Sequence, residues 1–427
     1  MVYDIVLQNV ELTEPGDGTL FNIGINGSTI GYVGTEPVTG REVIDGRNHL
    51  AVPGWVNAHT HVAMTLFRSY ADDMALMDWL QNRIWPLEAR LDGRAVYWGS
   101  LLGIAEMIRT GTTCFADMYF FMEETAKAAA DSGIRAVLSR GLTGSSVADG
   151  AARLEENTQL YKTWNGAQNG RITVMFGPHA PYTCSPDYLK SVIARARELG
   201  AEIHMHLSET AGEVADCRKQ YGKSPIALME ELGMFDGGTL AAHCVHVDEE
   251  DMDIMARHGV RVAHNPQSNL KLASGIAPVA RMLEKSITVG LGTDGASSNN
   301  NLDMLEEVRL AAMLAKTQSG DPKAVPASQA LAMGTWMGAE AVGLKNLGKL
   351  EVGQKADVVL YNMASPAWYP RHDRTSLLVY AGSSADVDTV LVDGNILLRK
   401  GELTTIDLEK VTAEVGQCLK EMTASAE

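Results

Sequence analysis

Two histidine pairs and one aspartate are the residues of this sequence best suited to hold a metal ion. His59 and His61 are separated by one residue, and so are His204 and His206. In a β-strand, positions i and i+2 point to the same face, so both members of a pair can reach one site. Asp294 ends an apolar run and is followed by small residues. Imidazoles combined with a carboxylate are typical ligands of Zn²⁺ or Fe²⁺.

Only one histidine of the second pair is expected to reach that site. His206 is nearer the end of its apolar run than His204, which we expect to hydrogen-bond one layer deeper. Three imidazoles and Asp294 leave a coordination position open for water, and a metal there makes hydroxide available near neutral pH. Unrelated polar residues at strand ends, or a metal-binding scaffold without turnover, are the alternative interpretations.

Short β-rich runs that alternate with helical stretches predict the elements that carry these residues. The runs cover residues 55–61, 112–118, 135–142, 172–179, 202–209, 239–246, 261–265 and 287–294. Helical stretches between them include residues 123–132, 187–199, 248–258 and 302–317. This alternation predicts an α/β fold with a (β/α)₈ TIM-type barrel, and a doubly wound sheet is the alternative. Most runs end in polar residues, as expected where catalytic groups stand at the carboxyl ends of barrel strands.

The two ends of the chain have a different pattern. Residues 3–10, 21–34, 356–361 and 389–399 are β-rich, with turns at Gly27-Ser28 and Asp393-Gly394. Short strands at both ends cannot each bury a face alone, so we expect one small β-sandwich domain built from both termini. The predicted domains are therefore residues 1–54 plus 351–427 for the β domain and residues 55–350 for the catalytic barrel.

Composition restricts the partners. The formal net charge is −17, which argues against binding to nucleic acid or to an anionic membrane. No apolar run approaches the ~20 residues that span a bilayer, and the first residues do not look like a secretory signal. The five cysteines are scattered without a CxxC pair, which is typical of a reduced compartment. We therefore expect a cytoplasmic protein with a small-molecule ligand, and a homo-oligomer is left open.

Five sequence blocks together resemble the amidohydrolase superfamily. They are PGWVNAHTH at 53–61, HMHLSE at 204–209, AHCVH at 242–246, HNPQSNLKLASGIAP at 264–278 and GTDGASSNNNLD at 292–303. Within the superfamily they are most similar to the group of 5′-methylthioadenosine and S-adenosylhomocysteine deaminases. The blocks are long and are spread over most of the chain, so the resemblance to the superfamily is more specific than the resemblance to one substrate group.

The resemblance implies three sets of site residues. The metal ligands are His59, His61, His206 and Asp294. The catalytic residues are Glu209, His243 and Asp294. The substrate contacts are Glu88, Arg140, Arg153 and His179, together with Glu209 and Asp294. Members with two metal ions carry a bridging lysine where this chain has His179, so the resemblance implies one zinc ion per subunit, with Fe²⁺ as the alternative.

The implied reaction is the hydrolytic deamination of the adenine ring of 5′-methylthioadenosine and S-adenosylhomocysteine, with adenosine as a further substrate, giving the inosyl product and ammonia. Glu209 would donate a proton to ring atom N1, and Asp294 would accept a proton from the attacking water. The alternative within the superfamily is another aminohydrolase that acts on guanine, a pterin or a triazine, including chlorohydrolases.

Overall fold

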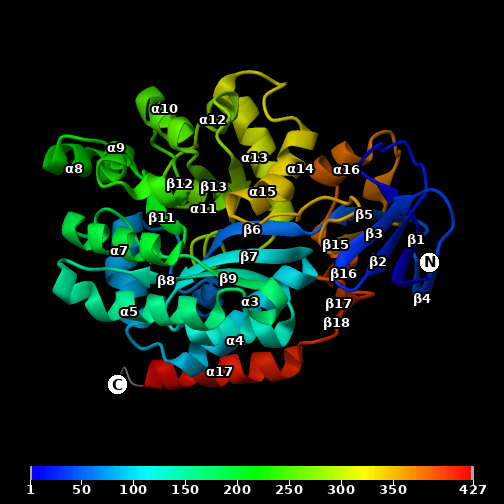
Figure 1. The fold of residues 1–427 in the computed structure, drawn as a ribbon, viewed down its shortest axis with the longest axis horizontal. Helices are drawn as coiled ribbons and strands as arrows, with labels where there is room; N and C mark the ends of the chain where they lie inside the picture. Colours follow the sequence, from blue (N-terminus) through cyan, green and yellow to red (C-terminus); the bar gives the residue numbers. More distant parts are fainter. Residues whose placement is uncertain (1, 425–427) are drawn as a thin grey trace.

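Eight strand positions of the computed structural model, which describes residues 2–424, surround a common axis (Figure 1). They are β6 (Trp55–Thr60), β7 (Thr112–Tyr119), β8 (Arg135–Leu142), β9 (Ile172–Val174) with β10 (Gly177–Pro178), β11 (Ile203–Leu207), β12 (Thr239–His243), β13 (Arg261–His264) and β14 (Val289–Leu291). Both β9 and β10 pair with β8, so they form one interrupted strand. Neighbouring strands are parallel throughout. The predicted (β/α)₈ barrel is therefore confirmed, and the doubly wound alternative is not observed.

Two seams close the barrel. A parallel bridge between Phe176 and Ile203 joins β10 to β11. At the other seam the backbone N–H of Asp294 donates to the carbonyl oxygen of His59 at 2.9 Å. A Cβ atom on Gly292 would lie 2.7 Å from that same carbonyl oxygen, so only glycine allows this approach. The closure places Asp294 directly beside the first histidine pair.

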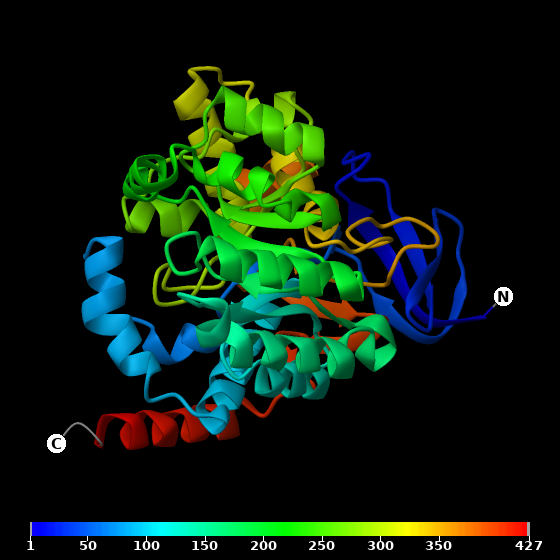
Figure 2. The ribbon, with the colours of Figure 1, turned by 60° about the vertical axis from the view of Figure 1, so that its left-hand side comes forward.

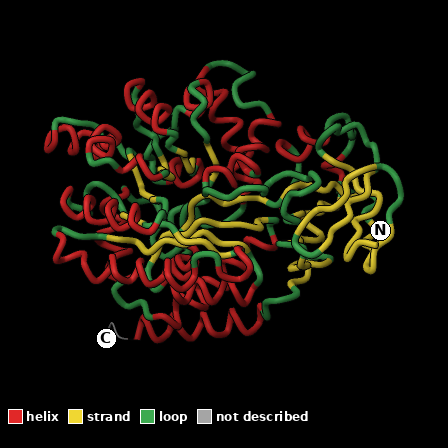
Figure 3. Tube along the Cα trace, in the orientation of Figure 1, coloured by secondary structure: helices red, strands yellow, loops and turns green. Residues whose placement is uncertain are grey.

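Helices cover the outside of the barrel (Figure 3). The longer ones are α3 (Gly93–Arg109), α4 (Met122–Ser132), α5 (Val147–Trp164), α7 (Pro186–Leu199), α8 (Ala211–Tyr221), α10 (Glu249–His258) and α13 (Met304–Ser319). The shorter ones are α6 (Ala167–Gly170), α9 (Pro225–Glu231), α11 (Pro266–Lys271), α12 (Val279–Glu284), α14 (Ala327–Gly334), α15 (Trp336–Ala341) and α16 (Arg374–Tyr380). Their ends follow local sequence: α7 begins after Ser185, whose Oγ accepts the N–H of Tyr188, and ends at Gly200 with φ 66°.

Strands from both chain ends form a second, mixed sheet. Its strands are β1 (Val2–Leu12), β2 (Phe21–Asn26), β3 (Thr29–Gly34), β4 (Thr39–Asp45), β5 (His49–Pro53), β15 (Val358–Asn362), β16 (Val387–Val392), β17 (Asn395–Arg399) and β18 (Glu402–Leu403). The antiparallel pair β5 and β15 joins the two chain ends. Arg135 of the barrel is buried and ion-paired with Asp357 at 2.9 Å and with Asp393 at 3.0 Å, which ties β8 to this sheet.

The C-terminal helix α17 (Leu408–Ala424) packs on α3 and lies on the outside of the barrel (Figure 1). Arg94 of α3 is ion-paired with Glu414 at 2.7 Å and with Glu421 at 3.0 Å. Residues 408–424 thus pack on the barrel although they fall within the predicted β domain. The division into 1–54 plus 351–427 and 55–350 stays a proposal, with α17 as the segment that crosses it.

A helical excursion follows β6 and stands out from the barrel (Figure 2). It comprises the 3₁₀ turn η1 (Val62–Phe67), the short helices α1 (Leu76–Trp79) and α2 (Trp85–Glu88), and one π-helical turn, η2 (Leu80–Ile84), between them. Such π turns are frequent near functional sites. Within the described residues, no helix is long and apolar enough to cross a bilayer.

Candidate metal centre and substrate cavity

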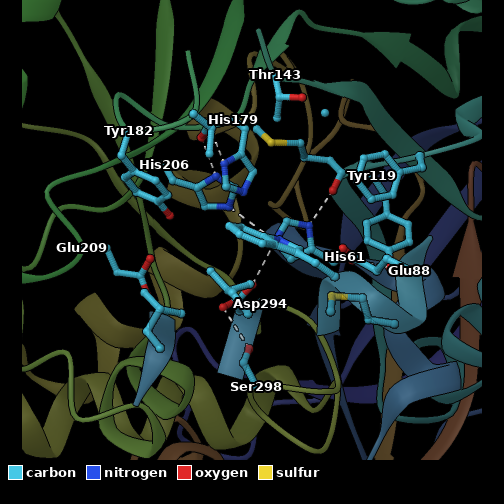
Figure 4. A pocket seen from close by; sticks show the side chains of 18 of the residues that line it. His61, Glu88, Tyr119, Thr143, His179, Tyr182, His206, Glu209, Asp294 and Ser298 are labelled. Carbon is cyan, nitrogen blue, oxygen red and sulfur yellow. Dashed lines mark hydrogen bonds and ion pairs between the residues drawn. The ribbon is translucent and has the colours of Figure 1, made fainter. Parts of the chain in front are cut away.

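The three predicted histidines and Asp294 converge at the carboxyl ends of the barrel strands, and Figure 4 shows His61, His206 and Asp294 of this group. Asp294 Oδ1 lies 3.5 Å from His59 Nε2 and 3.3 Å from His61 Nε2. His206 Nε2 lies 3.4 Å from His61 Nε2. Ligand atoms of His59, His61 and Asp294 form one group within 4.8 Å, and those of His59, His206 and His243 form another. The structure therefore brings together side chains from the carboxyl ends of β6, β11, β12 and β14.

Hydrogen bonds fix the ring orientation of each histidine. His61 Nδ1 donates to the carbonyl oxygen of Met118, and His206 Nδ1 donates to that of His179 at 2.7 Å. His59 Nδ1 contacts His204 Nε2 at 2.9 Å, so His204 lies one layer deeper, as predicted. Because each Nδ1 is engaged outside the centre, each Nε2 points into it, the arrangement that orients metal-binding histidines.

The histidine rings are neutral and can act as ligands. Burial lowers the pKa of His59 to about 4 and holds the pKa of His206 well below its usual value. The pKa of His61 is also lowered, again by burial first. His59 Nε2 is buried without a hydrogen-bond partner among the described residues. Buried polar atoms in proteins almost always have a hydrogen-bond partner or a bound ion. An imidazole nitrogen without such a partner, facing a carboxylate, therefore fits a bound cation.

Asp294 is held in a strained but well-bonded conformation. Its Oδ2 accepts hydrogen bonds from Ser268 Oγ at 2.7 Å and from Ser298 Oγ at 3.0 Å. Its backbone has φ 60°, in the left-handed region that L-residues rarely occupy. Burial opposes ionisation, but the adjacent imidazoles of His59 and His61 outweigh it, and the pKa of Asp294 stays well below the usual range. Asp294 is therefore a carboxylate whose Oδ1 faces the histidines.

A cavity of about 650 Å³ opens above this centre. Its floor is formed by His61, His206, His243 and Asp294, and its walls include Met64, Trp79 and Trp85 of the helical excursion. Phe67, at the end of η1 in the same excursion, is buried and does not line the cavity. A largely apolar cavity with a few convergent polar groups is the usual form of a small-molecule site.

Glu209 lies beside the floor and faces His243. Glu209 Oε2 lies 3.9 Å from His243 Nε2, and Ser274 Oγ donates to Glu209 Oε1 at 3.4 Å. His243 Nδ1 donates to Asn269 Oδ1 at 2.9 Å, which turns Nε2 toward the cavity. Burial raises the pKa of Glu209. Burial lowers the pKa of His243, but the charges of Glu209 and Asp294 exceed this effect and raise it. This pair can exchange protons with a ligand.

The predicted substrate contacts fall into two groups. Glu88, Arg153 and His179 line the cavity, and Glu88 Oε1 accepts a hydrogen bond from the hydroxyl of Tyr119 at 2.7 Å. Arg140 does not line it, because its Nε donates to Glu156 Oε2 at 2.7 Å and its guanidinium lies 5.0 Å from the centroid of the Phe120 ring. The predicted site residues thus line one cavity except Arg140 and His59, and buried His59 lies within the metal cluster.

Glu213 is a residue that sequence reasoning missed. Its Oε1 accepts the N–H of Ser208 and its Oε2 accepts the N–H of Glu209, both at 2.8 Å. Ser208 has φ 54°, in the left-handed region that costs a non-glycine residue conformational energy, so neighbouring interactions must hold this turn. The signal was the pattern Thr210-Ala-Gly-Glu213, which resembles a helix capping box. In the structure the Glu213 carboxylate accepts the N–H groups of Ser208 and Glu209, and so holds Glu209 in place.

We expect Glu213→Gln to lower both kcat and stability. An amide nitrogen cannot accept a hydrogen bond, so one buried N–H loses its partner, at a cost of about 1–3 kcal/mol in the free energy of unfolding. Urea unfolding and steady-state kinetics measure the two effects. Asp216→Asn, an exposed change on the same helix, is the control. A Glu213→Gln protein with unchanged kcat and stability would contradict the positioning role.

Comparison with known proteins agrees with this geometry. Residues 50–397 match the model of the Amidohydrolase family. The chain is 56% identical to 5-methylthioadenosine/S-adenosylhomocysteine deaminase of Dictyoglomus thermophilum, over 87% of each chain. It is 51% identical to the protein of the same name from Carboxydothermus hydrogenoformans, over 93% of this chain and 92% of the relative.

A solved structure shows the same likeness. The crystal structure of an adenosine deaminase from Xanthomonas campestris with bound zinc superposes with a TM-score of 0.93. It is 33% identical to this chain, and the match covers 99% of both. The chain therefore belongs to the amidohydrolase family, in the branch represented by the 5-methylthioadenosine/S-adenosylhomocysteine deaminases.

Proposed function

We propose that this protein removes the 6-amino group of 5′-methylthioadenosine and S-adenosylhomocysteine by hydrolysis. The observation that carries the proposal is the placement of Glu209 and His243, 3.9 Å apart, beside the cluster of His59, His61, His206 and Asp294 on the cavity floor. The names of the relatives, more than half identical to this chain, supply the substrate class. The zinc in the adenosine deaminase of Xanthomonas campestris supports the choice of metal.

The residues that would hold a single zinc ion are His59, His61, His206 and Asp294. Zinc fits because the imidazoles are neutral and one carboxylate completes a nitrogen and oxygen donor set. When bound, it supplies a nucleophilic water at neutral pH by lowering the pKa of that water. Fe²⁺ accepts the same donors, so metal analysis decides between the two.

Two carboxyl groups of the protein, those of Glu209 and Asp294, would move the protons. Attack of water at C6 breaks the aromaticity of the ring, so ring atom N1 must gain a proton. Glu209, whose pKa is raised by burial, is placed to donate that proton and to hold the ring by the resulting hydrogen bond. Asp294 Oδ1 is placed to accept a proton from the attacking water and to pass it to the leaving amine. As the amine leaves and the C6 carbonyl forms, the C6 hydroxyl proton would return to Glu209 and restore the acid. His243 Nε2 faces the same space and stabilises the developing negative charge.

A panel of substrates on metal-analysed protein tests the proposed function. We expect loss of adenine absorbance and release of ammonia with 5′-methylthioadenosine and S-adenosylhomocysteine, and none with guanine, a pterin or a triazine. Turnover of guanine alone would make the protein a different aminohydrolase. Metal-loaded protein that turns over nothing in the panel would favour the scaffold interpretation.

Glu88 is expected to make kcat/KM depend on pH near neutrality. Burial raises the pKa of Glu88 to about 7, although the Tyr119 hydroxyl opposes this shift. Below that value the carboxyl is neutral, and above it a carboxylate accepts ribose hydroxyl hydrogens more strongly. Because the acceptor form grows as the pH rises, kcat/KM for 5′-methylthioadenosine should rise by up to about tenfold across one or two pH units around the pKa.

Glu88→Gln is the control for this pH effect, because an amide of the same shape cannot titrate. The ratio of wild-type to variant kcat/KM isolates Glu88 from the other titrating groups. We expect this ratio to increase with pH and to level off on the alkaline side. A ratio that is flat across the neutral range would show that Glu88 ionisation plays no part.

A further inference from the structure

An oppositely charged pair lies at the end of the cavity away from the metal centre. Asp149 and Arg153 stand one turn apart on α5 and both line the cavity. Thr143 and Ser145, from the loop before α5, line it beside them. Figure 4 places Thr143 on the opposite side of the pocket from Asp294. The pair therefore faces the part of a bound nucleoside that is farthest from the reacting ring.

Arg153 keeps part of its guanidinium free. Its Nη1 donates to the carbonyl oxygens of Asp149 at 2.9 Å and of Thr143 at 3.2 Å. Within residues 2–424, its Nε and Nη2 make no hydrogen bond. The backbone contacts fix the side chain, and the free N–H groups can receive a carboxylate, which a guanidinium binds with two parallel hydrogen bonds.

Asp149 is held by one carboxylate oxygen and leaves the other available. Its Oδ2 accepts the backbone N–H of Ser145 at 2.9 Å and the Oγ–H of the same residue at 3.2 Å. These two hydrogen bonds lower the pKa of Asp149, so the group is ionised near neutral pH. Its Oδ1 lies 3.7 Å from Arg153 Nη1, which is an ion-pair distance and too long for a hydrogen bond. Oδ1 therefore makes no hydrogen bond within residues 2–424, and Asp149 lines the cavity.

We propose that Asp149 binds the α-ammonium group of the homocysteine moiety of S-adenosylhomocysteine, next to a carboxylate bound by Arg153. The inference rests on the proposed function and adds a cation subsite to it. An α-amino acid carries its ammonium and carboxylate on one carbon, so the two binding groups must also lie close together. The 3.7 Å separation of Asp149 Oδ1 and Arg153 Nη1 meets this requirement.

The other carboxylates of the cavity are engaged elsewhere. Among the described residues that line it, these are Glu88, Glu209 and Asp294. Glu88 accepts the Tyr119 hydroxyl, and the other two lie against the histidines of the floor. Asp149 is therefore the lining carboxylate that remains for a cation at the far end. A thioether substrate without the amino acid has no group for it, so Asp149 should distinguish substrates by their tails.

Asp149→Asn with four nucleosides tests this subsite. The substrates are 5′-methylthioadenosine, S-adenosylhomocysteine, an analogue of the latter without the amino group, and an analogue without the carboxylate. We expect kcat/KM to fall about tenfold for the two compounds with an ammonium group, the effect of one charge-assisted hydrogen bond. For the compound with only a carboxylate it should stay the same or rise, because a repelling charge is gone. For 5′-methylthioadenosine it should stay the same.

The main rival is that Asp149 only orients Arg153. In that case Asp149→Asn would lower kcat/KM for the carboxylate-only analogue as much as for S-adenosylhomocysteine, and the proposal would be overturned. An equal change in kcat/KM for all four compounds, or no change for any of them, would overturn the proposal too. Glu155→Gln, an exposed change of the same charge on α5 whose partner is Arg195, is the matched control. Failure of the proposed function is a separate result, since the wild-type protein would then deaminate none of the four.

Discussion

Asp294→Ala is expected to lose both bound metal and catalysis. The change removes Oδ1, which lies 3.3 Å from His61 Nε2 and 3.5 Å from His59 Nε2, and so removes the negative ligand of the proposed centre. Changes in the residues that merely support metal ligands already cost about 10–100-fold in affinity, so losing a ligand should exceed that range. The same variant lacks the proton acceptor, and kcat should fall by about 10⁴. Mass spectrometry of the metal content and ammonia release measure the two effects.

Asp294→Asn separates charge from shape in this experiment. Asparagine keeps the volume and an oxygen that Ser268 and Ser298 can bond, but it removes the negative charge. We expect intermediate metal content and a kcat as low as that of the alanine variant, because an amide does not accept a proton. Circular dichroism checks that both variants fold. A fully metallated alanine variant would refute the ligand role of Asp294.

The barrel and its floor could be predicted from the sequence because their signals are local. The two-residue spacing of His59 and His61 predicts that both face one side of a strand, and in the structure His59 lies in β6 and His61 follows its last residue, Thr60. Polar residues at the ends of buried apolar runs likewise indicate one rim of the barrel. The choice of His206 over His204 depended on position along one strand alone. Such features need no knowledge of distant contacts.

Features that depend on tertiary packing could not be predicted in this way. The apolar spacing of Val411, Val415 and Cys418 is typical of a helix, but nothing in it shows that α17 packs on α3. The resemblance likewise supplied Arg140 and Arg153 together. Loop geometry then separates them, since Arg153 lines the cavity and Arg140 is bonded to Glu156 outside it.

Glu209→Gln is expected to retain its metal but to lose most of its turnover. Glutamine has the shape of the glutamic acid and can still accept the Ser274 hydroxyl, so the cavity should be preserved. Its amide cannot give a proton to N1, and loss of a general acid costs about 10²–10⁴ in rate. Because burial raises the pKa of Glu209, the wild-type group keeps its proton to a higher pH than a free glutamate.

Measuring kcat together with metal content and the free energy of unfolding distinguishes this role from a structural one. A proton donor acts in the transition state, so kcat should fall while the metal content and the unfolding free energy of Glu209→Gln stay near those of the wild type. A residue that only supported the turn at Ser208 would instead lower stability, as expected for Glu213→Gln. Wild-type kcat in metallated Glu209→Gln would remove Glu209 from the chemistry. Proton transfer to N1 would then need another donor, and His243, whose Nε2 lies 3.9 Å from Glu209 Oε2, is a candidate.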